Sequence, residues 1–195
     1  LRSLVGSEMW IRDRVSTAAV AVENTHNVGG GAVQPYETLV ELSKLCRAVG
    51  VGVHLDGARL WNAHVATGVP LADYGRLFDT ISVCFSKGLG APIGSMVVGS
   101  RDFIKEARRA RKVIGGGMRQ AGILAAAALM ALEEGIPRLH EDHLHARQIA
   151  ETLAELPGIE IDLESVQTNL LFFRVCREDM TAPQLCDRLA QYDVK

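Results

Sequence analysis

Apolar residues along the chain fall into short runs that alternate with longer amphipathic stretches. Four short runs, rich in Val, Ile and Ala, have the length of buried strands: residues 18–22, 51–56, 80–85 and 93–98. Helical spacing of apolar residues predicts a helix at 35–49 and a shorter one at 60–67. Alternation of strands with helices predicts an α/β fold with a mostly parallel sheet and right-handed crossovers.

The second half of the chain is helical before its pattern changes. We expect helices at residues 101–114, 118–134 and 140–156, separated by glycines at 115–117 and by Gly135-Ile-Pro137. After Pro157-Gly158, a short strand from Ile159, a strand at 169–175 and a helix at 182–191 predict a small α+β unit.

This pattern divides the chain into three parts. Residues 1–14 have neither helical nor strand periodicity and resemble a translated sequencing adapter, so we expect them to be a non-native head. Residues 15–137 are expected to form part of a large domain. Residues 138–195 are expected to supply a connecting helix and an incomplete small C-terminal domain.

Composition narrows the classes of partner. The chain has 195 residues, 48% of them hydrophobic, and a formal net charge of -2, which gives no field for nucleic acid or an anionic membrane. No apolar run approaches the roughly 18 residues that span a bilayer. Four widely spaced cysteines without a C-x-x-C pair fit a reducing cytosol. We therefore expect a cytoplasmic protein with small-molecule ligands and further subunits as partners.

Two of the predicted strands end near ionisable side chains, Asp56 and Lys87. Because ligands bind beyond the carboxyl ends of parallel strands, both groups are expected to face one crevice. A lysine there suits a Schiff base, and an aspartate suits a protonated ring nitrogen, so the pair fits pyridoxal phosphate (PLP). An ordinary salt bridge or an exposed lysine is the alternative interpretation of the spacing.

Four motifs surround this pair, in order along the chain: Glu23-Asn-Thr-His-Asn27, His54-Leu-Asp56-Gly-Ala-Arg59, Ser86-Lys87-Gly-Leu-Gly-Ala-Pro92-Ile-Gly-Ser95 and Gly115-Gly-Gly-Met-Arg119-Gln. From about residue 15 onward the chain resembles the low-specificity L-threonine aldolases. The resemblance implies the PLP-dependent transferase fold (fold type I). It also implies retro-aldol cleavage of L-threonine or L-allo-threonine, which are β-hydroxy-α-amino acids, to glycine and acetaldehyde.

The resemblance also implies roles for individual residues. Lys87 would hold PLP as the catalytic Schiff-base lysine, Asp56 would pair with the pyridine nitrogen, and Arg59 would hydrogen-bond near the cofactor O3′ or the substrate carboxylate. Arg119 and Lys112 would be cationic groups near the cofactor phosphate, supplied across the interface of a homodimer or homotetramer.

Three further residues are candidates for support behind these groups: His26, His54 and Ser86. His54 precedes Asp56 by two and so shares its face of the strand. His140, His143 and His145 do not share one helical face, so we expect a solvated helix surface and no metal. The basic run at 108–112 lies near the C-terminus of a predicted helix, where the helix dipole favours cations. We therefore do not interpret it as a nucleic-acid-binding surface.

The chain also departs from the family pattern. The stacking histidine, the Gly-Thr phosphate loop and the arginine that grips the substrate carboxylate have no counterpart in it. We therefore expect the 195-residue chain alone to bind PLP weakly or not at all and to be inactive. Three alternative functions stay open: another PLP-dependent β-eliminating lyase, an aminotransferase, and an inactive PLP-fold binding subunit.

Overall fold

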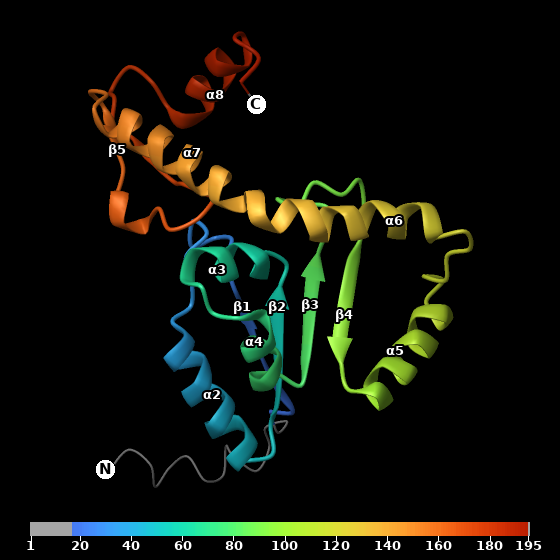
Figure 1. The fold of residues 1–195 in the computed structure, drawn as a ribbon. Coiled ribbons are helices and arrows are strands. Elements are labelled where there is room, and N and C mark those ends of the chain that lie inside the picture. The colour runs from blue at the N-terminus through green and yellow to red at the C-terminus, as the bar shows by residue number, and fades with distance from the viewer. Residues whose placement is uncertain (1–16, 195) are drawn as a thin grey trace, which may run out of the picture.

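The fold is built on one four-stranded sheet. The computed structural model describes residues 17–194, and the predicted head at residues 1–14 lies outside them. The sheet has the order β1-β2-β3-β4, with β1 (Ala19–Glu23), β2 (Gly52–Gly57), β3 (Thr80–Cys84) and β4 (Ser95–Gly99) (Figure 1). The first three strands are parallel and β4 is antiparallel to β3, which confirms the mostly parallel α/β sheet.

Alternation within the strands separates two faces of the sheet. Val53, Leu55, Ile81 and Val83 are buried on one face beneath three helices: α2 (Tyr36–Ala48), α3 (Leu60–Thr67) and α4 (Leu71–Leu77). Each such aliphatic side chain contributes roughly 1.5–3 kcal/mol when fully buried. The intervening polar residues point to the opposite face, where the candidate site chemistry lies.

Helix α4 was not predicted, because it is short and only one of its side chains is buried. That side chain, Tyr74, is fully buried and meets Tyr36 edge-on at 5.6 Å between ring centroids. A single buried aromatic carries no periodicity that a sequence pattern could reveal.

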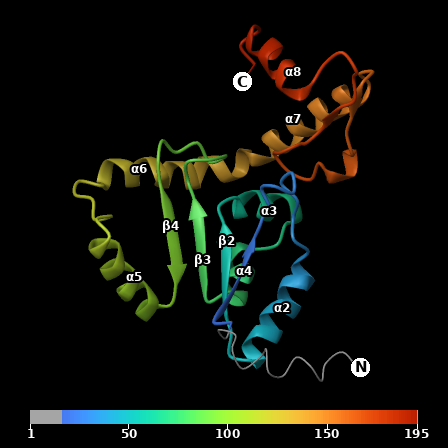
Figure 2. The same ribbon diagram turned by 180° about the vertical axis from the view of Figure 1, so that it is seen from behind.

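A long helical rod crosses the carboxyl end of β3, as both views show (Figures 1 and 2). It consists of α6 (Gly122–Met130), the π-helical turn η1 (Ala131–Gly135) and α7 (Ile136–Ala154). The predicted helix at 118–134 therefore begins four residues late, and the expected break at Gly135–Pro137 is wrong. Pro137 occupies the first turn of α7, where its missing N–H is tolerated.

Before this rod, α5 (Arg101–Val113) follows β4 and begins at Ser100, whose hydroxyl accepts a hydrogen bond from the Phe103 N–H. No helix among residues 17–194 has both the length and the apolar character needed to cross a membrane. The rod runs without a break through residue 137. The domain boundary expected there stays a prediction.

The C-terminal part is smaller than predicted in its strand content. β5 (Ile159–Glu160) pairs antiparallel with β6 (Arg174–Val175), and η2 (Leu163–Ser165) and α8 (Ala182–Ala190) complete it. The strand expected at 169–175 is reduced to its last two residues. The hydrogen bonds to the loop after β1 come from Gln167 and Thr168, just before the expected strand.

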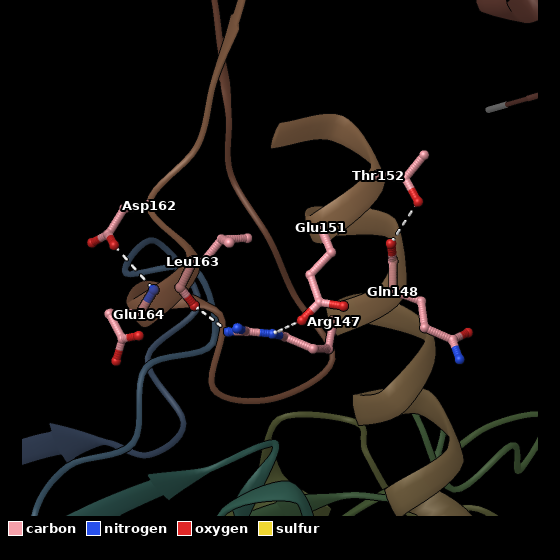
Figure 3. A network of polar contacts seen from close by, with 7 residues as sticks. All are labelled: Arg147, Gln148, Glu151, Thr152, Asp162, Leu163 and Glu164. Carbon is pink, nitrogen blue, oxygen red and sulfur yellow. Dashed lines mark hydrogen bonds and ion pairs between the residues drawn. The ribbon is translucent and has the colours of Figure 1, made fainter. Parts of the chain in front are cut away.

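Arg147 fixes the start of that C-terminal segment on α7 (Figure 3). Its Nη1 donates to the Leu163 carbonyl at 2.8 Å and its Nε donates to Glu151 at 2.6 Å. Asp162 caps the same turn by accepting from the Glu164 N–H at 3.0 Å. The turn η2 is thus tied to the helix before the chain turns back toward the sheet.

Two hydrogen bonds then join this segment to the loop after β1. The Thr168 hydroxyl donates to the Gly31 carbonyl at 2.7 Å, and the Gln167 side chain accepts from the Val33 N–H at 2.8 Å. Thr168 is 1% exposed, and its Oγ1 lies 2.5 Å from where a Cβ on Gly31 would stand. Gly31 also has φ of +77°, so only glycine suits this position.

We expect Thr168→Val to lower the free energy of unfolding by about 1–3 kcal/mol, because it leaves the buried Gly31 carbonyl without a donor. Urea denaturation of the variant measures this loss. Thr168→Ser keeps the hydroxyl and is the matched control, with a smaller loss from one methyl group. Equal losses in the two variants would contradict the role of the hydrogen bond.

Candidate functional site

A row of polar side chains crosses the open face of the sheet near its carboxyl end. Strand register places Glu23, Asp56 and Ser82 side by side on neighbouring strands, and in-register parallel residues share a face. Asp56 is exposed, and its Oδ1 accepts from the Ala58 N–H at 3.1 Å and from the Ser82 hydroxyl at 3.5 Å. These donors fix one carboxylate oxygen and orient the side chain.

Gly57 is required behind this carboxylate. A Cβ there would stand 2.9 Å from the Ser82 carbonyl and 3.1 Å from the Leu60 Cβ. The close approach lets β2 run directly into α3 while it stays paired with β3. The local sequence Asp56-Gly57 therefore places the carboxylate at the point where the strand ends.

Lys87 lies in a turn three residues beyond the end of β3. Its carbonyl accepts from the Gly90 N–H at 2.8 Å, and the Phe85 carbonyl accepts from the Ala91 N–H at 3.1 Å. Gly90 has φ of +79°, as the tight turn requires. Ser86 and Lys87 are both exposed, and they follow β3, the strand that pairs in parallel with the strand of Asp56.

Arg59 stands at the N-cap of α3, three residues after Asp56, and is half-buried. Its backbone carbonyl accepts from the Asn62 N–H at 3.0 Å, which begins the helix. No ion pair involves Asp56, Arg59 or Lys87 among residues 17–194, so the salt bridge considered for the Asp56–Lys87 pair does not form there.

The two histidines near the sheet have local partners. His54 Nδ1 lies 2.7 Å from the Thr80 hydroxyl, and this pair lies two residues before the Asp56–Ser82 pair on the same two strands. His26 Nε2 lies 3.6 Å from Glu23 Oε2, and Gly29 is small enough to lie against the ring. Both rings are half-buried, and a role behind the row stays a prediction.

Lys112 and Arg119 are not brought to this row. Lys112 lies in the last turn of α5 with its side chain against Gly117, and Arg119 is exposed in the turn before α6. Figure 1 places both segments beyond β4, on the side away from β2. Within one copy of residues 17–194, no hydrogen bond or ion pair joins them to Asp56 or Lys87.

The histidines of α7 differ from their expected common environment. His140 and His145 are exposed, but His143 is half-buried against α3, so a wholly solvated surface is wrong for it. Burial lowers the pKa of His143, while Asp142 acts in the opposite direction and His140 adds to the lowering. No cluster of three or more metal-ligating side chains occurs in the part of the chain that the structure describes.

Glu23, Ser82 and Asn62 were not among the predicted site residues. The signal for Ser82 is in the sequence, since Thr80, Ser82 and Cys84 alternate with apolar residues and so share one face of β3. The register that pairs Ser82 with Asp56 is visible only in the structure. A hollow of about 720 Å³ between β4 and α5 extends to Ser82, but Asp56 and Lys87 do not line it.

These features define an α/β protein with a carboxylate and a lysine at the carboxyl ends of neighbouring parallel strands, the edge of such a sheet where ligands generally bind. The model of the beta-eliminating lyase family matches residues 8–176. The chain belongs to this family.

Individual relatives agree with the family match. The chain is 46% identical over 157 residues to low-specificity L-threonine aldolase 1 of Arabidopsis thaliana, covering 80% of this chain and 44% of that protein. A solved candidate L-allo-threonine aldolase from Listeria monocytogenes EGD-E shares 28% identity with a TM-score of 0.74, over 82% of this chain and 45% of that one.

A PLP-dependent aminotransferase from Streptococcus suis 89-1591 shares the fold at 17% identity and a TM-score of 0.65, over 95% of this chain and 49% of that one. These neighbours confirm the expected large-domain fold of PLP-dependent enzymes, fold type I. The chain spans about half the length of the relatives that it matches.

Proposed function

We propose that the complete protein containing this chain is a PLP-dependent lyase that cleaves L-threonine and L-allo-threonine to glycine and acetaldehyde. The observation that carries the proposal is the placement of Asp56 and Lys87 at the ends of adjacent parallel strands, each without a charged partner among residues 17–194. The threonine aldolase relatives named above support the choice of substrate.

The residues present fit the cofactor in kind. Asp56 has one oxygen held by Ala58 and Ser82, which aims the carboxylate and suits it to hold a proton on a ring nitrogen. Lys87 is exposed on a tight turn, so its amine can reach an aldehyde. Arg59, half-buried at the start of α3, is placed to donate to an anionic oxygen.

Bound PLP would supply an electron sink for the bond between Cα and Cβ of the substrate. The chain's own part is to orient and to move protons. Asp56 would hold positive charge at the ring nitrogen of the bound cofactor. Lys87 would hold the cofactor through its amine, and that amine, when free, would be the group placed to carry a proton at the substrate Cα.

Lys112 and Arg119 are proposed to act from a second copy of the chain. Both are exposed and distant from Asp56 within one copy, and the nearby rod presents exposed Ile123, Leu129 and Met130. A homodimer or homotetramer would cover these apolar side chains and bring the cations to a cofactor phosphate. Sedimentation that finds a fully active monomer would rule this out.

We also propose a cytoplasmic location. Its support is that Cys46, Cys84, Cys176 and Cys186 are all free thiols.

The family description supports a second candidate, β-elimination on another amino acid. Trapping the released aldehyde from threonine, allo-threonine and serine, with pyruvate and ammonia measured in parallel, separates the two reactions. Acetaldehyde with equimolar glycine from threonine supports the aldolase. A keto acid with ammonia supports elimination, keto acid with transfer of the amino group supports an aminotransferase, and no turnover supports an inactive binding subunit.

A further inference from the structure

The main chain just after Lys87 rests on two helices. A Cβ on Gly88 would stand 2.8 Å from Leu139 Cδ2 of α7, and 3.8 Å from Asn62 Oδ1 of α3. One residue further on, the Leu89 carbonyl lies 2.8 Å from where a Cβ on Gly135 would stand. The path of the lysine turn is therefore set by how α3 and the helical rod meet.

One buried polar contact lies at that meeting. Asn62 is 2% exposed, and its Nδ2 lies 3.1 Å from Nε2 of His143. In this arrangement the amide N–H donates to an unprotonated ring nitrogen. The lowered pKa of His143, caused first by burial, favours that neutral ring.

His143 is the hydrogen-bond partner of the buried Asn62 amide. Asp142 and His140 of the same helix are the charged or titratable groups that act on the ring, and the residue that it meets on α3 is the neutral Asn62. Asn62 Nδ2 has no other hydrogen-bond partner among residues 17–194. Without the ring nitrogen, the buried Asn62 amide donor would be unpaired. A shift of α7 against α3 would be needed to bring it another partner or water.

We propose that His143 is a positioning residue for Lys87. By pairing with Asn62 it holds α3 and α7 in the arrangement that supports the Gly88–Leu89 main chain, and so fixes the direction in which the Lys87 amine leaves its turn. The inference rests on the proposed function only in taking Lys87 as the residue that bonds PLP. A displacement of about 1 Å at such a residue costs roughly 10²-fold in reactivity.

The test compares acceptor and non-acceptor side chains at position 143 in the complete protein. PLP is titrated into each variant, its affinity is read from the visible absorbance of lysine-bound PLP, and the bond at Lys87 is trapped with borohydride. We expect His143→Phe to weaken PLP binding about tenfold, the equivalent of one hydrogen bond. His143→Gln keeps an acceptor and should stay within about threefold.

The control is His145→Phe, which makes the same substitution at an exposed histidine on the same helix and should bind PLP as the unaltered protein does. Thermal unfolding is measured for every variant, and His143→Met, which is smaller and more adaptable, replaces His143→Phe if the latter does not fold. Unchanged PLP affinity in the folded non-acceptor variant overturns the proposal. An equal loss of PLP affinity in His143→Gln also overturns it, because the hydrogen-bond acceptor would then not matter. Failure of both non-acceptor variants to fold overturns it as well, because His143 would then have a structural role alone.

These readouts use no amino-acid substrate and so separate the two proposals. A His143 effect on PLP binding without threonine cleavage would overturn the proposed reaction and leave the positioning role in place. If the complete protein cleaves threonine but His143→Phe binds PLP with unchanged affinity, the proposed reaction stands and the positioning role is overturned. No PLP binding by the unaltered complete protein would overturn both.

Discussion

Replacing Lys87 with Ala should reduce the release of glycine from threonine by at least about 10³-fold in the complete protein. The variant loses two contributions together: the covalent bond to the cofactor and a positioned proton carrier, of which the second alone contributes roughly 10²–10⁴-fold. Because Lys87 is exposed and forms no ion pair among residues 17–194, its truncation should leave the fold intact.

Three measurements check this expectation. They are the turnover of threonine, the visible absorbance of lysine-bound PLP, and the mass of the peptide labelled by borohydride trapping. Lys44→Ala removes another exposed lysine, on α2, and should match the unaltered protein in all three. Cleavage that survives in Lys87→Ala would show that the bonding lysine has been placed wrongly.

The fold around the site was largely predictable from the sequence, because its strands are short runs rich in apolar residues that alternate with helices. Within these runs Val53, Leu55, Ile81 and Val83 are buried, and the residues between them are less so. The spacing between Asp56 and Lys87 allowed their strands to be neighbours, and β2 and β3 do pair in parallel. Local pattern and long-range pairing agree here.

The helical rod was less predictable, because glycine and proline have two meanings. Gly135 predicted a break, but the structure uses its missing side chain to let the rod approach Leu89. Pro137 predicted an interruption, but it falls in the first turn of α7 after a π-helical turn. A sequence pattern does not distinguish a glycine that ends a helix from one that allows close packing.

Contacts between distant segments could not be predicted at all. Thr168 and Gly31 are 137 residues apart, and their hydrogen bond lies just before the segment 169–175, of which only the last two residues form a strand. Asn62 and His143 are 81 residues apart, and the charged sequence around His143 resembles an ordinary solvated helix. Both contacts depend on which helix faces which loop, and no periodicity carries that information.

Replacing Asp56 with Asn should reduce threonine cleavage by roughly 10²–10³-fold with little loss of stability. A carboxylate next to a ring nitrogen raises the nitrogen's pKa by about 1–3 units, so a neutral amide loses that much of the cationic form. Asn keeps an oxygen for the Ala58 N–H and the Ser82 hydroxyl, so the local hydrogen bonds survive the change. Asp56→Glu keeps the charge but displaces it, and should fall between Asp56→Asn and the unaltered protein.

Asp79 provides the matched control, because it is a second carboxylate that hydrogen-bonds to β2, at the strand's opposite end. Its Oδ2 accepts from the Val53 N–H at 2.8 Å. Asp79→Asn keeps an oxygen for this bond and loses only its charge, so it should lower the free energy of unfolding by about 1 kcal/mol. Activity per folded molecule should not change. Turnover and urea denaturation of both variants then separate chemistry from stability: equal losses of turnover would mean that Asp56 acts only through the fold. Loss of turnover confined to Asp56→Asn would instead show that the reaction requires the Asp56 charge at the carboxyl end of the sheet. The comparison is matched because the two substitutions each neutralise one carboxylate, at opposite ends of β2.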